Sequence, residues 1–413
     1  MKSVDAHVAE VLRTVAPLQP LPLPLADAHG CVLAEDVTAA APLPGFDNSA
    51  MDGYAVRLAD VASASEAAPV ALPVVGDIAA GDRGGISIRP GFCARIMTGA
   101  PMPPGADAVV PVEWTDGGVS SVVVRRAPAL GQHVRRAGEE APVGATLLPA
   151  GTFLGAAQIA LVAAANRSSV SCRPRPRVVV LSTGSELVET GSPLEHGQIP
   201  DSNSHMLLAA CREAGAMAYR VGMVADDPAV LLETLEDQLI RADLLLTTGG
   251  VSVGAYDVVK EVLTRLGTVA FEKVAMQPGM PQGFGTLGGD TPGAEPVPIF
   301  TLPGNPVSAL VSFEVFVRPA LRRMLGAETV LRPQVRVEAA EPFRSPPGKR
   351  SFLRVVVGRE SDGRLLARAA GGQGSHMLTA MAAANALLVV PEDTTEVAVG
   401  TTLPALLLER RGS

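Results

Sequence analysis

Three glycine-rich loops follow apolar, strand-like runs within one stretch of the chain. They read Leu-Ser-Thr-Gly-Ser-Glu-Leu at 181–187, Leu-Thr-Thr-Gly-Gly-Val-Ser-Val-Gly at 246–254 and Leu-Pro-Gly-Asn-Pro at 302–306. Glycine and small hydroxyl residues at the carboxyl end of a strand leave backbone N–H groups free to face an anion. The three loops therefore predict a phosphate-binding site, with a phosphorylated small molecule as its ligand.

The segment from Arg177 to about Leu325 alternates buried strands with helices. This alternation is typical of βαβ units and predicts a doubly wound parallel sheet, whose ligands bind beyond the carboxyl ends of the strands. Pro319 is expected to kink or divide the last helix, because it lacks a backbone donor. We expect strands over 178–181, 218–224, 244–246 and 299–302, and helices over 204–214, 229–241, 257–266 and 307–324.

The regions on either side of this segment have a different pattern. Short Val and Ile runs broken by Gly and Pro between Val70 and Leu148 predict a small β-rich module. A helix is expected over 151–166, and short strands from Pro333 onward predict a small C-terminal β domain.

Composition excludes several classes of function. The formal net charge of -8 at pH 7 argues against a broad surface for nucleic acid or anionic membranes. The four cysteines lack C-x-x-C spacing, so no zinc or thiol redox site is expected. Asp5 and Glu10 interrupt the region where a signal peptide would need apolar residues, and the longest apolar segment, 153–165, is too short to span a bilayer. We expect a cytoplasmic protein.

Carboxylates accompany the predicted phosphate loops. Asp257 lies in the first turn of the helix after the second loop, where it either stabilises the helix dipole or binds a cation. A carboxylate beside a phosphate repels it unless a cation stands between them, which makes Asp257 a candidate magnesium ligand. Glu186 and Asp226 are candidates for the same cation, although Asp227 followed by Pro228 is equally typical of a helix N-cap.

Asn305 and Pro306 are expected to cap the next helix and occupy its first position, which alone would be local structure. Two further polar, turn-rich loops, 44–56 and 95–105, lie outside the α/β segment. Loops of this kind often carry function.

These motifs together resemble those of the MoeA family, which includes the gephyrin E domain. The residues that carry the resemblance are distributed over nearly the whole chain. They are Gly-Phe-Asp-Asn-Ser-Ala-Met-Asp-Gly-Tyr-Ala at 45–55, Arg-Ile-Met-Thr-Gly-Ala-Pro at 95–101, the loop at 181–187, Thr-Gly-Gly-Val-Ser-Val-Gly at 248–254 and Leu-Pro-Gly-Asn-Pro-Val-Ser at 302–308.

The resemblance implies a molybdopterin molybdenumtransferase. Such an enzyme inserts molybdate into adenylylated molybdopterin and releases AMP with the help of Mg²⁺, as a homodimer that works with other molybdenum cofactor biosynthesis proteins. The implied architecture is an α/β multidomain chain. Its domains are a discontinuous helical and dimerisation domain at 1–52 and 141–172, a β-rich domain at 53–140, a molybdopterin-binding α/β domain at 173–328 and a C-terminal β-barrel at 329–413.

The same resemblance assigns site residues. Those expected to be catalytic are Asp52, Thr98, Glu140, Glu186 and Lys273, and the expected metal ligands are Asp226, Asp257 and Glu186. Those expected to bind substrate are Ser182, Thr183, Gly184, Thr248, Gly249, Gly250, Ser252, Gly254, Pro303, Gly304, Asn305, Ser308, Arg354 and Ser375.

Three positions depart from the family pattern. Glu140 stands where the family usually has aspartate, and Gln277 and Met280 stand where lysines implicated in holding molybdate are common. Glutamine keeps a neutral donor and methionine keeps none, whereas hydrogen bonds to charged groups are about twice as strong as neutral ones. These departures favour an alternative function, a molybdopterin-binding carrier or scaffold with weak or lost metal insertion.

A second alternative is a transferase that forms the adenylate instead of cleaving it. The N-terminal loops and the C-terminal β domain argue against it, because the resemblance in those regions is specific to the insertion enzymes.

Overall fold

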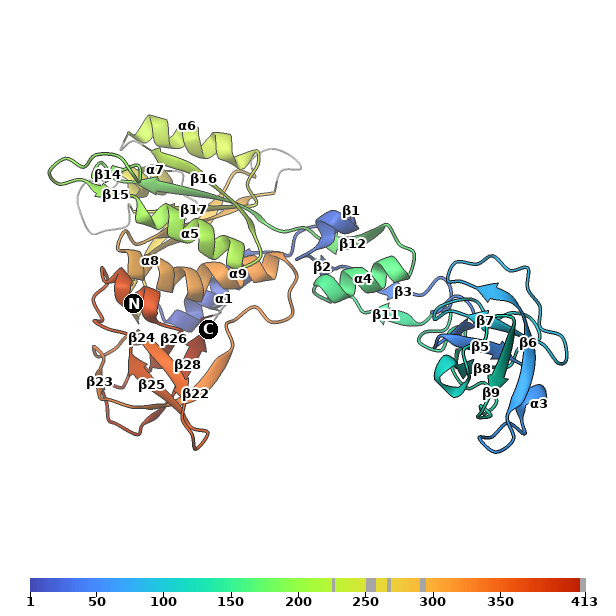
Figure 1. The fold of residues 1–413 in the computed structure, drawn as a ribbon. Helices are drawn as coiled ribbons and strands as arrows, with labels where there is room; N and C mark the ends of the chain where they lie inside the picture. Colours follow the sequence, from blue (N-terminus) through green and yellow to red (C-terminus); the bar gives the residue numbers. More distant parts are fainter. Residues whose placement is uncertain (225–226, 250–257, 266–268, 290–294, 409–413) are drawn as a thin grey trace. The chain divides into compact units, whose positions relative to one another are not determined.

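The structure is a computed structural model that describes residues 1–224, 227–249, 258–265, 269–289 and 295–408. The chain divides into two units, which we describe separately (Figure 1). The larger unit contains Met1–Leu23, Ala28–Ala34 and Ser171–Ser413, and the smaller contains Pro24–Asp27 and Glu35–Val170. This division is coarser than the four domains expected from the sequence, whose boundaries stay a prediction.

A six-stranded sheet forms the centre of the larger unit, with the order β16-β13-β17-β21-β20-β18. The first four strands pair in parallel, as the sequence predicted. The last two pair antiparallel, and the sequence analysis predicted neither of them. The strands are β13 (Arg177–Thr183), β16 (Met217–Val224), β17 (Leu244–Thr248), β18 (Val269–Lys273), β20 (Pro281–Leu287) and β21 (Val297–Leu302).

The antiparallel edge follows from the length of its connection. Only residues 274–280 join β18 to β20, which is too short for the crossover that a parallel pair requires. The sequence prediction missed both strands because neither has an uninterrupted apolar run: β20 contains two glycines and β18 ends in Glu272 and Lys273.

Helices cover both faces of the sheet, which confirms the doubly wound arrangement (Figure 1). Alternate residues of β13 enter two separate cores, because successive side chains of a strand point to opposite faces. Val178 and Val180 pack in one core, and Val179 and Leu181 in the other. The first core contains residues of α1 (Val4–Thr14), α5 (Ser202–Glu213), α8 (Pro306–Ser312) and α9 (Arg318–Met324), and the second those of α6 (Pro228–Leu239) and α7 (Val258–Arg265).

The last helix of this region is divided, as predicted from Pro319. A π-helical segment, η2 (Phe313–Val317), separates α8 from α9, and Pro319 lies in the first turn of α9. Proline cannot donate the backbone hydrogen bond that would continue the preceding α-helix. Buried Glu314 of this segment accepts from Arg332 through Nε at 2.7 Å and Nη2 at 3.0 Å, so its charge is paired.

The C-terminal part of the larger unit is a closed five-stranded barrel, as expected. The strand order β24-β25-β22-β28-β26 is closed by pairing between β24 and β26. The strands are β22 (Gln334–Ala339), β24 (Arg350–Arg359), β25 (Leu365–Ala369), β26 (Ala386–Val390) and β28 (Thr402–Leu407), with α10 (Leu378–Ala383) beside them. The unit also contains β2 (Val32–Leu33), β14 (Leu187–Val188), β15 (Ile199–Pro200), β19 (Met276–Gln277), β23 (Phe343–Arg344) and β27 (Glu396–Val397).

The smaller unit is built on a five-stranded sheet with the order β8-β5-β7-β6-β9, so the predicted β-rich module is present. Its strands are β5 (Gly53–Val56), β6 (Val70–Ile78), β7 (Cys93–Ile96), β8 (Ala108–Pro111) and β9 (Ser121–Val124). The other elements are β3 (Val37–Thr38), β4 (Asn48–Ser49), α3 (Leu58–Val61), η1 (Val112–Trp114), β10 (Val134–Arg135), β11 (Thr146–Leu148) and α4 (Ala156–Ala164). The chain passes between the units through β1 (Leu21–Pro24), α2 (Leu25–Ala28) and β12 (Ser169–Arg173).

In the described part of the chain, no helix combines the length and the apolar character needed to cross a membrane.

The central sheet gives a first testable prediction. Leu246 of β17 is fully buried, and Leu194 in a surface loop of the same unit is 54% exposed. Leu246→Ala is expected to lower the free energy of unfolding by about 2–5 kcal/mol, because it removes apolar contacts and leaves a cavity. The control Leu194→Ala should change it by less than about 0.5 kcal/mol. Urea unfolding of both variants measures the difference, and equal losses would contradict the described packing.

Candidate functional site

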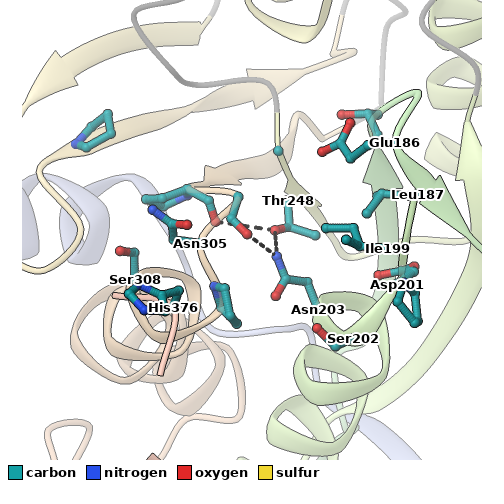
Figure 2. Close-up of a pocket in the computed structure, with 17 residues that line it drawn as sticks. Glu186, Leu187, Ile199, Asp201, Ser202, Asn203, Thr248, Asn305, Ser308 and His376 are labelled. Atoms are coloured by element: carbon teal, nitrogen blue, oxygen red, sulfur yellow. Dashed lines mark hydrogen bonds between the residues drawn. The ribbon is translucent and has the colours of Figure 1, made fainter. Parts of the chain in front are cut away.

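A cavity of about 670 Å³ lies at the carboxyl ends of the parallel strands (Figure 2). The end of β13 and the loop after it contribute Thr183 and Glu186, and the end of β17 and the loop after it contribute Thr248 and Gly249. The loop after β21 contributes residues 303–306. The three glycine-rich loops meet because β13, β17 and β21 are adjacent in the sheet and point the same way.

Among the described glycines of these loops, Gly249 is the one at which a side chain would clash with the backbone of a neighbouring loop. Its φ is +91°, and a Cβ atom at this position would lie 2.5 Å from the carbonyl oxygen of Thr183. At Gly304 the same atom would have an ordinary contact of 3.7 Å with the Cα atom of Gly249. The backbones of the first and second loops therefore lie so close together that only glycine, which has no side chain, fits at this position.

Asn203, which no motif predicted, joins the second loop to the third. Its Nδ2 atom donates to Thr248 Oγ1 at 2.9 Å and to the carbonyl oxygen of Gly304 at 2.7 Å (Figure 2). Asn203 Oδ1 and Thr183 Oγ1 are buried and have no hydrogen-bond partner in the part of the chain that the structure describes. An unpaired buried polar atom costs about 1–3 kcal/mol, so a ligand that supplied donors here would recover that energy.

Asp201 lines the cavity from the N-cap of α5. It is fully buried and accepts from Ser182 Oγ at 3.0 Å, from the Ser204 backbone N–H at 3.0 Å and from Ser204 Oγ at 2.5 Å. Ser182, an expected substrate contact, is thus buried with its hydroxyl directed at the Asp201 carboxylate. An aspartate shortly before the predicted helix was the signal that could have identified Asp201 as an N-cap.

An ion pair between Glu189 and Arg220 holds the segment that follows the first loop. This segment, residues 186–200, forms one wall of the cavity and contains the parallel pair β14 and β15. Glu189 accepts from Arg220 at 2.8 and 2.5 Å, and Arg220 Nε donates to Ser204 Oγ at 2.6 Å. Hydrogen bonding within the pair lowers the pKa of Glu189 and raises the pKa of Arg220. The wall is therefore anchored to α5 and β16.

The third loop leads into α8, where Asn305 occupies the N-cap and Pro306 the first turn. Both positions are as predicted, but Asn305 makes no side-chain capping bond, so its amide remains available to the cavity (Figure 2). The carbonyl oxygen of Ser375 accepts from the Val307 N–H at 3.1 Å instead. Ser308 and His376 also line the cavity.

Arg354, an expected substrate-binding residue, lies in a strand of the C-terminal barrel. It is fully buried in β24 and is not among the residues lining the cavity. Its Nη2 atom donates to the carbonyl oxygens of Gly372 at 2.9 Å and Gly374 at 3.1 Å, and burial lowers its pKa. Arg354 therefore holds the segment that presents Ser375 and His376.

Lys273 ends the edge strand β18, and Gln277 and Met280 lie in the connection from β18 to β20. Exposed Lys273 pairs in register with Pro281, which lines the cavity. Gln277 is exposed in β19, which pairs with β24 in the barrel, and the Met280 carbonyl oxygen accepts from the Val274 N–H at 2.8 Å.

The smaller unit brings two of its expected residues together. Asp52 Oδ1 accepts from the Thr98 backbone N–H at 2.6 Å and from Thr98 Oγ1 at 2.9 Å. These bonds, led by the backbone one, lower the pKa of Asp52. Glu140 is exposed, and its backbone N–H donates to the carbonyl oxygen of Leu43. Five expected site residues lie outside the described residues: Asp226, Gly250, Ser252, Gly254 and Asp257.

Family models match most of the chain. The MoeA N-terminal region (domain I and II) matches residues 2–166, a probable molybdopterin binding domain matches 179–323, and the MoeA C-terminal region (domain IV) matches 336–408. The chain belongs to the MoeA family.

Relatives of this family resemble the chain over its full length. A Mycobacterium tuberculosis protein named molybdopterin molybdenumtransferase 2 is 47% identical over 409 residues, which are 98% of each chain. Molybdopterin molybdenumtransferase 1 of the same organism is 41% identical over all of both chains. The crystal structure of a molybdopterin biosynthesis MoeA protein from Pyrococcus horikoshii has a TM-score of 0.76 and 28% identity, covering 98% of this chain and 100% of the other. The expectation of a transferase of molybdenum cofactor biosynthesis is confirmed.

The short distance between Gly249 and the Thr183 carbonyl oxygen gives a testable prediction about the stability of the loops at the cavity. Gly222 is a matched control, because its φ is +92° and a Cβ atom there would meet nothing within 4 Å. Gly222→Ala is expected to cost only backbone strain of about 1–2 kcal/mol. Gly249→Ala should cost about 1–3 kcal/mol more, because Thr183 must also move. The free energies of unfolding of the two variants test this, and equal values would mean that the loops are not in contact.

Proposed function

We propose that this MoeA-family chain inserts molybdate into adenylylated molybdopterin and releases AMP, with Mg²⁺ bound at the cavity. The observation that carries the proposal is the convergence of three glycine-rich strand-end loops on one cavity of about 670 Å³. A volume of this order is typical of sites that enclose a small molecule. The relatives named molybdopterin molybdenumtransferase support the choice of substrate.

The cavity offers both donors and acceptors to such a substrate. Backbone N–H groups of the loops suit phosphate oxygens. The buried acceptors Asn203 Oδ1 and Thr183 Oγ1 suit N–H groups such as those of a pterin ring. Because Asn203 also ties Thr248 to Gly304, substrate bound there would be held against two loops at once. Positioning of this kind can supply much of a rate enhancement.

The donor chemistry at the cavity fits Mg²⁺, which prefers oxygen ligands. Glu186 presents an exposed carboxylate at the cavity wall, and we assign Asp226 and Asp257 to the same ion from the family motif. Bound Mg²⁺ would neutralise phosphate charge and polarise the phosphoanhydride that is cleaved. Asp201 is a poorer ligand, since both of its oxygens already accept hydrogen bonds.

We assign molybdate to the Lys273 side of the cavity, where an exposed ammonium lies on the strand beside Pro281. Asp52, Thr98 and Glu140 would act from the second subunit of a homodimer. The protein would work in the cytoplasm with other molybdenum cofactor biosynthesis proteins.

A second candidate function is a molybdopterin carrier with weak or lost metal insertion. It is favoured by Gln277 and Met280, which lack the positive charge that common lysines would give. The two functions differ in product: a carrier binds adenylylated molybdopterin without releasing AMP or taking up molybdenum.

The deciding experiment incubates the full-length protein with adenylylated molybdopterin, Mg²⁺ and a series of molybdate concentrations. AMP release and molybdenum incorporation are measured separately. The insertion enzyme should give both products, with incorporation that saturates in molybdate. Tight substrate binding with neither product would select the carrier.

A pair of glutamates tests the magnesium assignment. Glu186→Gln keeps the shape of a cavity residue but removes its charge, and Glu195→Gln makes the same change at an exposed position of the same segment that does not line the cavity. Glu186→Gln is expected to raise the Mg²⁺ concentration for half-maximal AMP release by about tenfold or more, and Glu195→Gln should leave it unchanged. Asp257→Ala should abolish AMP release. Unaltered Mg²⁺ dependence in Glu186→Gln would remove Glu186 from the ligand set.

A further inference from the structure

A second cluster of ionisable side chains lies away from the cavity. Lys2 and two residues of α1, His7 and Glu10, converge on Glu272 of β18, some 262 to 270 positions further along the chain. The Lys2 ammonium donates to Glu10 Oε2 and, at 2.6 Å, to Glu272 Oε2. Two carboxylates thus share one ammonium, which leaves the cluster with an excess of negative charge.

The imidazole of His7 is directed into this cluster without a partner of its own. Its side chain is 3% exposed, and Nδ1 makes no hydrogen bond within the described residues. Nδ1 lies 3.6 Å from Glu10 Oε2 and 3.9 Å from Glu272 Oε2, which is too far for a hydrogen bond. The ring is fixed edge-on against Phe316, with centroids 4.7 Å apart, so it points at the carboxylates because packing holds it there.

This geometry suits a metal ion. One nitrogen and two carboxylate oxygens lie within 4.8 Å of one another. Around a tetrahedral Zn²⁺ with bonds of about 2.1 Å, neighbouring ligand atoms stand roughly 3.4 Å apart, so small side-chain movements would complete the set. Imidazole with carboxylates is a donor set that Zn²⁺ and similar first-row ions accept, whereas Mg²⁺ favours oxygen alone.

We propose that His7, Glu10 and Glu272 form a binding site for a first-row divalent cation such as Zn²⁺, which takes the position of the Lys2 ammonium. The Lys2 side chain is 22% exposed and can turn to solvent while its backbone stays in place. That backbone is held independently, because the Lys2 N–H donates to the Lys273 carbonyl oxygen at 3.0 Å and the Lys2 carbonyl oxygen accepts from Ala275 at 2.8 Å. A divalent ion would neutralise both carboxylates and give His7 Nδ1 the partner it lacks.

The site would join α1 directly to the edge strand of the central sheet. It is separate from the loops that form the cavity and does not rest on the proposed reaction. Its ligands differ from the cavity carboxylates in including a nitrogen, so the two sites should select different metals.

The test uses Co²⁺ as a coloured substitute for Zn²⁺ and adds it to metal-stripped full-length protein. Excess Mg²⁺ is present throughout, so that Mg²⁺ occupies any site made of oxygen ligands alone. The wild type is expected to bind Co²⁺ with the visible absorption of a low-coordinate ion, which Zn²⁺ abolishes. Lys2→Ala should tighten binding by about tenfold, because it removes the competing ammonium. Glu10→Gln and Glu272→Gln, both at partly exposed positions, should weaken it by at least about tenfold.

His7→Gln should also lose the absorption, with circular dichroism used to show that the buried substitution leaves the protein folded. The matched control is His205→Gln, since His205 lies 3.8 Å from Glu189 but is 46% exposed; it should bind as the wild type does. Equal affinities for the wild type, Lys2→Ala and Glu10→Gln would overturn the proposal. So would absence of Co²⁺ absorption in Lys2→Ala up to ~1 mM metal.

Discussion

The parallel pairing of β13, β17 and β21 is the constraint on which the rest of the larger unit depends. Because alternate side chains of each strand enter different cores, helices must cover both faces. The strands then end together at one edge, where three turns must share a small space. Gly249 shows how little space there is, because a Cβ atom at this position would clash with the carbonyl oxygen of Thr183. The cavity is a consequence of strand direction and of which residues can turn there.

The elements that sequence predicts well are those with a periodic apolar pattern. The four parallel strands and the helices between them follow from such patterns, whereas the division of the last helix was predicted from the missing backbone donor of Pro319. The antiparallel strands β18 and β20 could not be found this way. A Cβ atom at Gly283 of β20 would lie 2.8 Å from the Phe271 ring and 2.9 Å from Thr301. Glycine is therefore required here by residues on two other strands, which come into contact with it only when the chain folds. The local sequence pattern around Gly283 gives no information about these contacts.

For the site, motifs located residues along the chain but did not give the direction of their side chains. Ser182 belongs to the first loop motif and Arg354 was assigned from the family resemblance, yet the first donates to Asp201 and the second to the carbonyls of Gly372 and Gly374. Their positions depend on which polar groups the fold leaves opposite them. Asn203 is the converse case, since its importance comes from two acceptors on different loops that no reading of one loop reveals.

The edge of the central sheet connects the proposed metal site beside α1 with the position proposed for molybdate beside Lys273. β18 is the last strand in the sheet order and carries Glu272 and Lys273 as neighbours. Successive residues of a strand face opposite sides, so one turns toward the α1 cluster while the other is free for a different environment. Lys273 pairs with Pro281 at the cavity, and its carbonyl oxygen accepts from the Lys2 N–H. A metal ion bound by Glu272 would thus restrain the strand that presents Lys273, without touching any residue of the cavity. The two sites would be coupled through one edge strand, by restraint of its backbone.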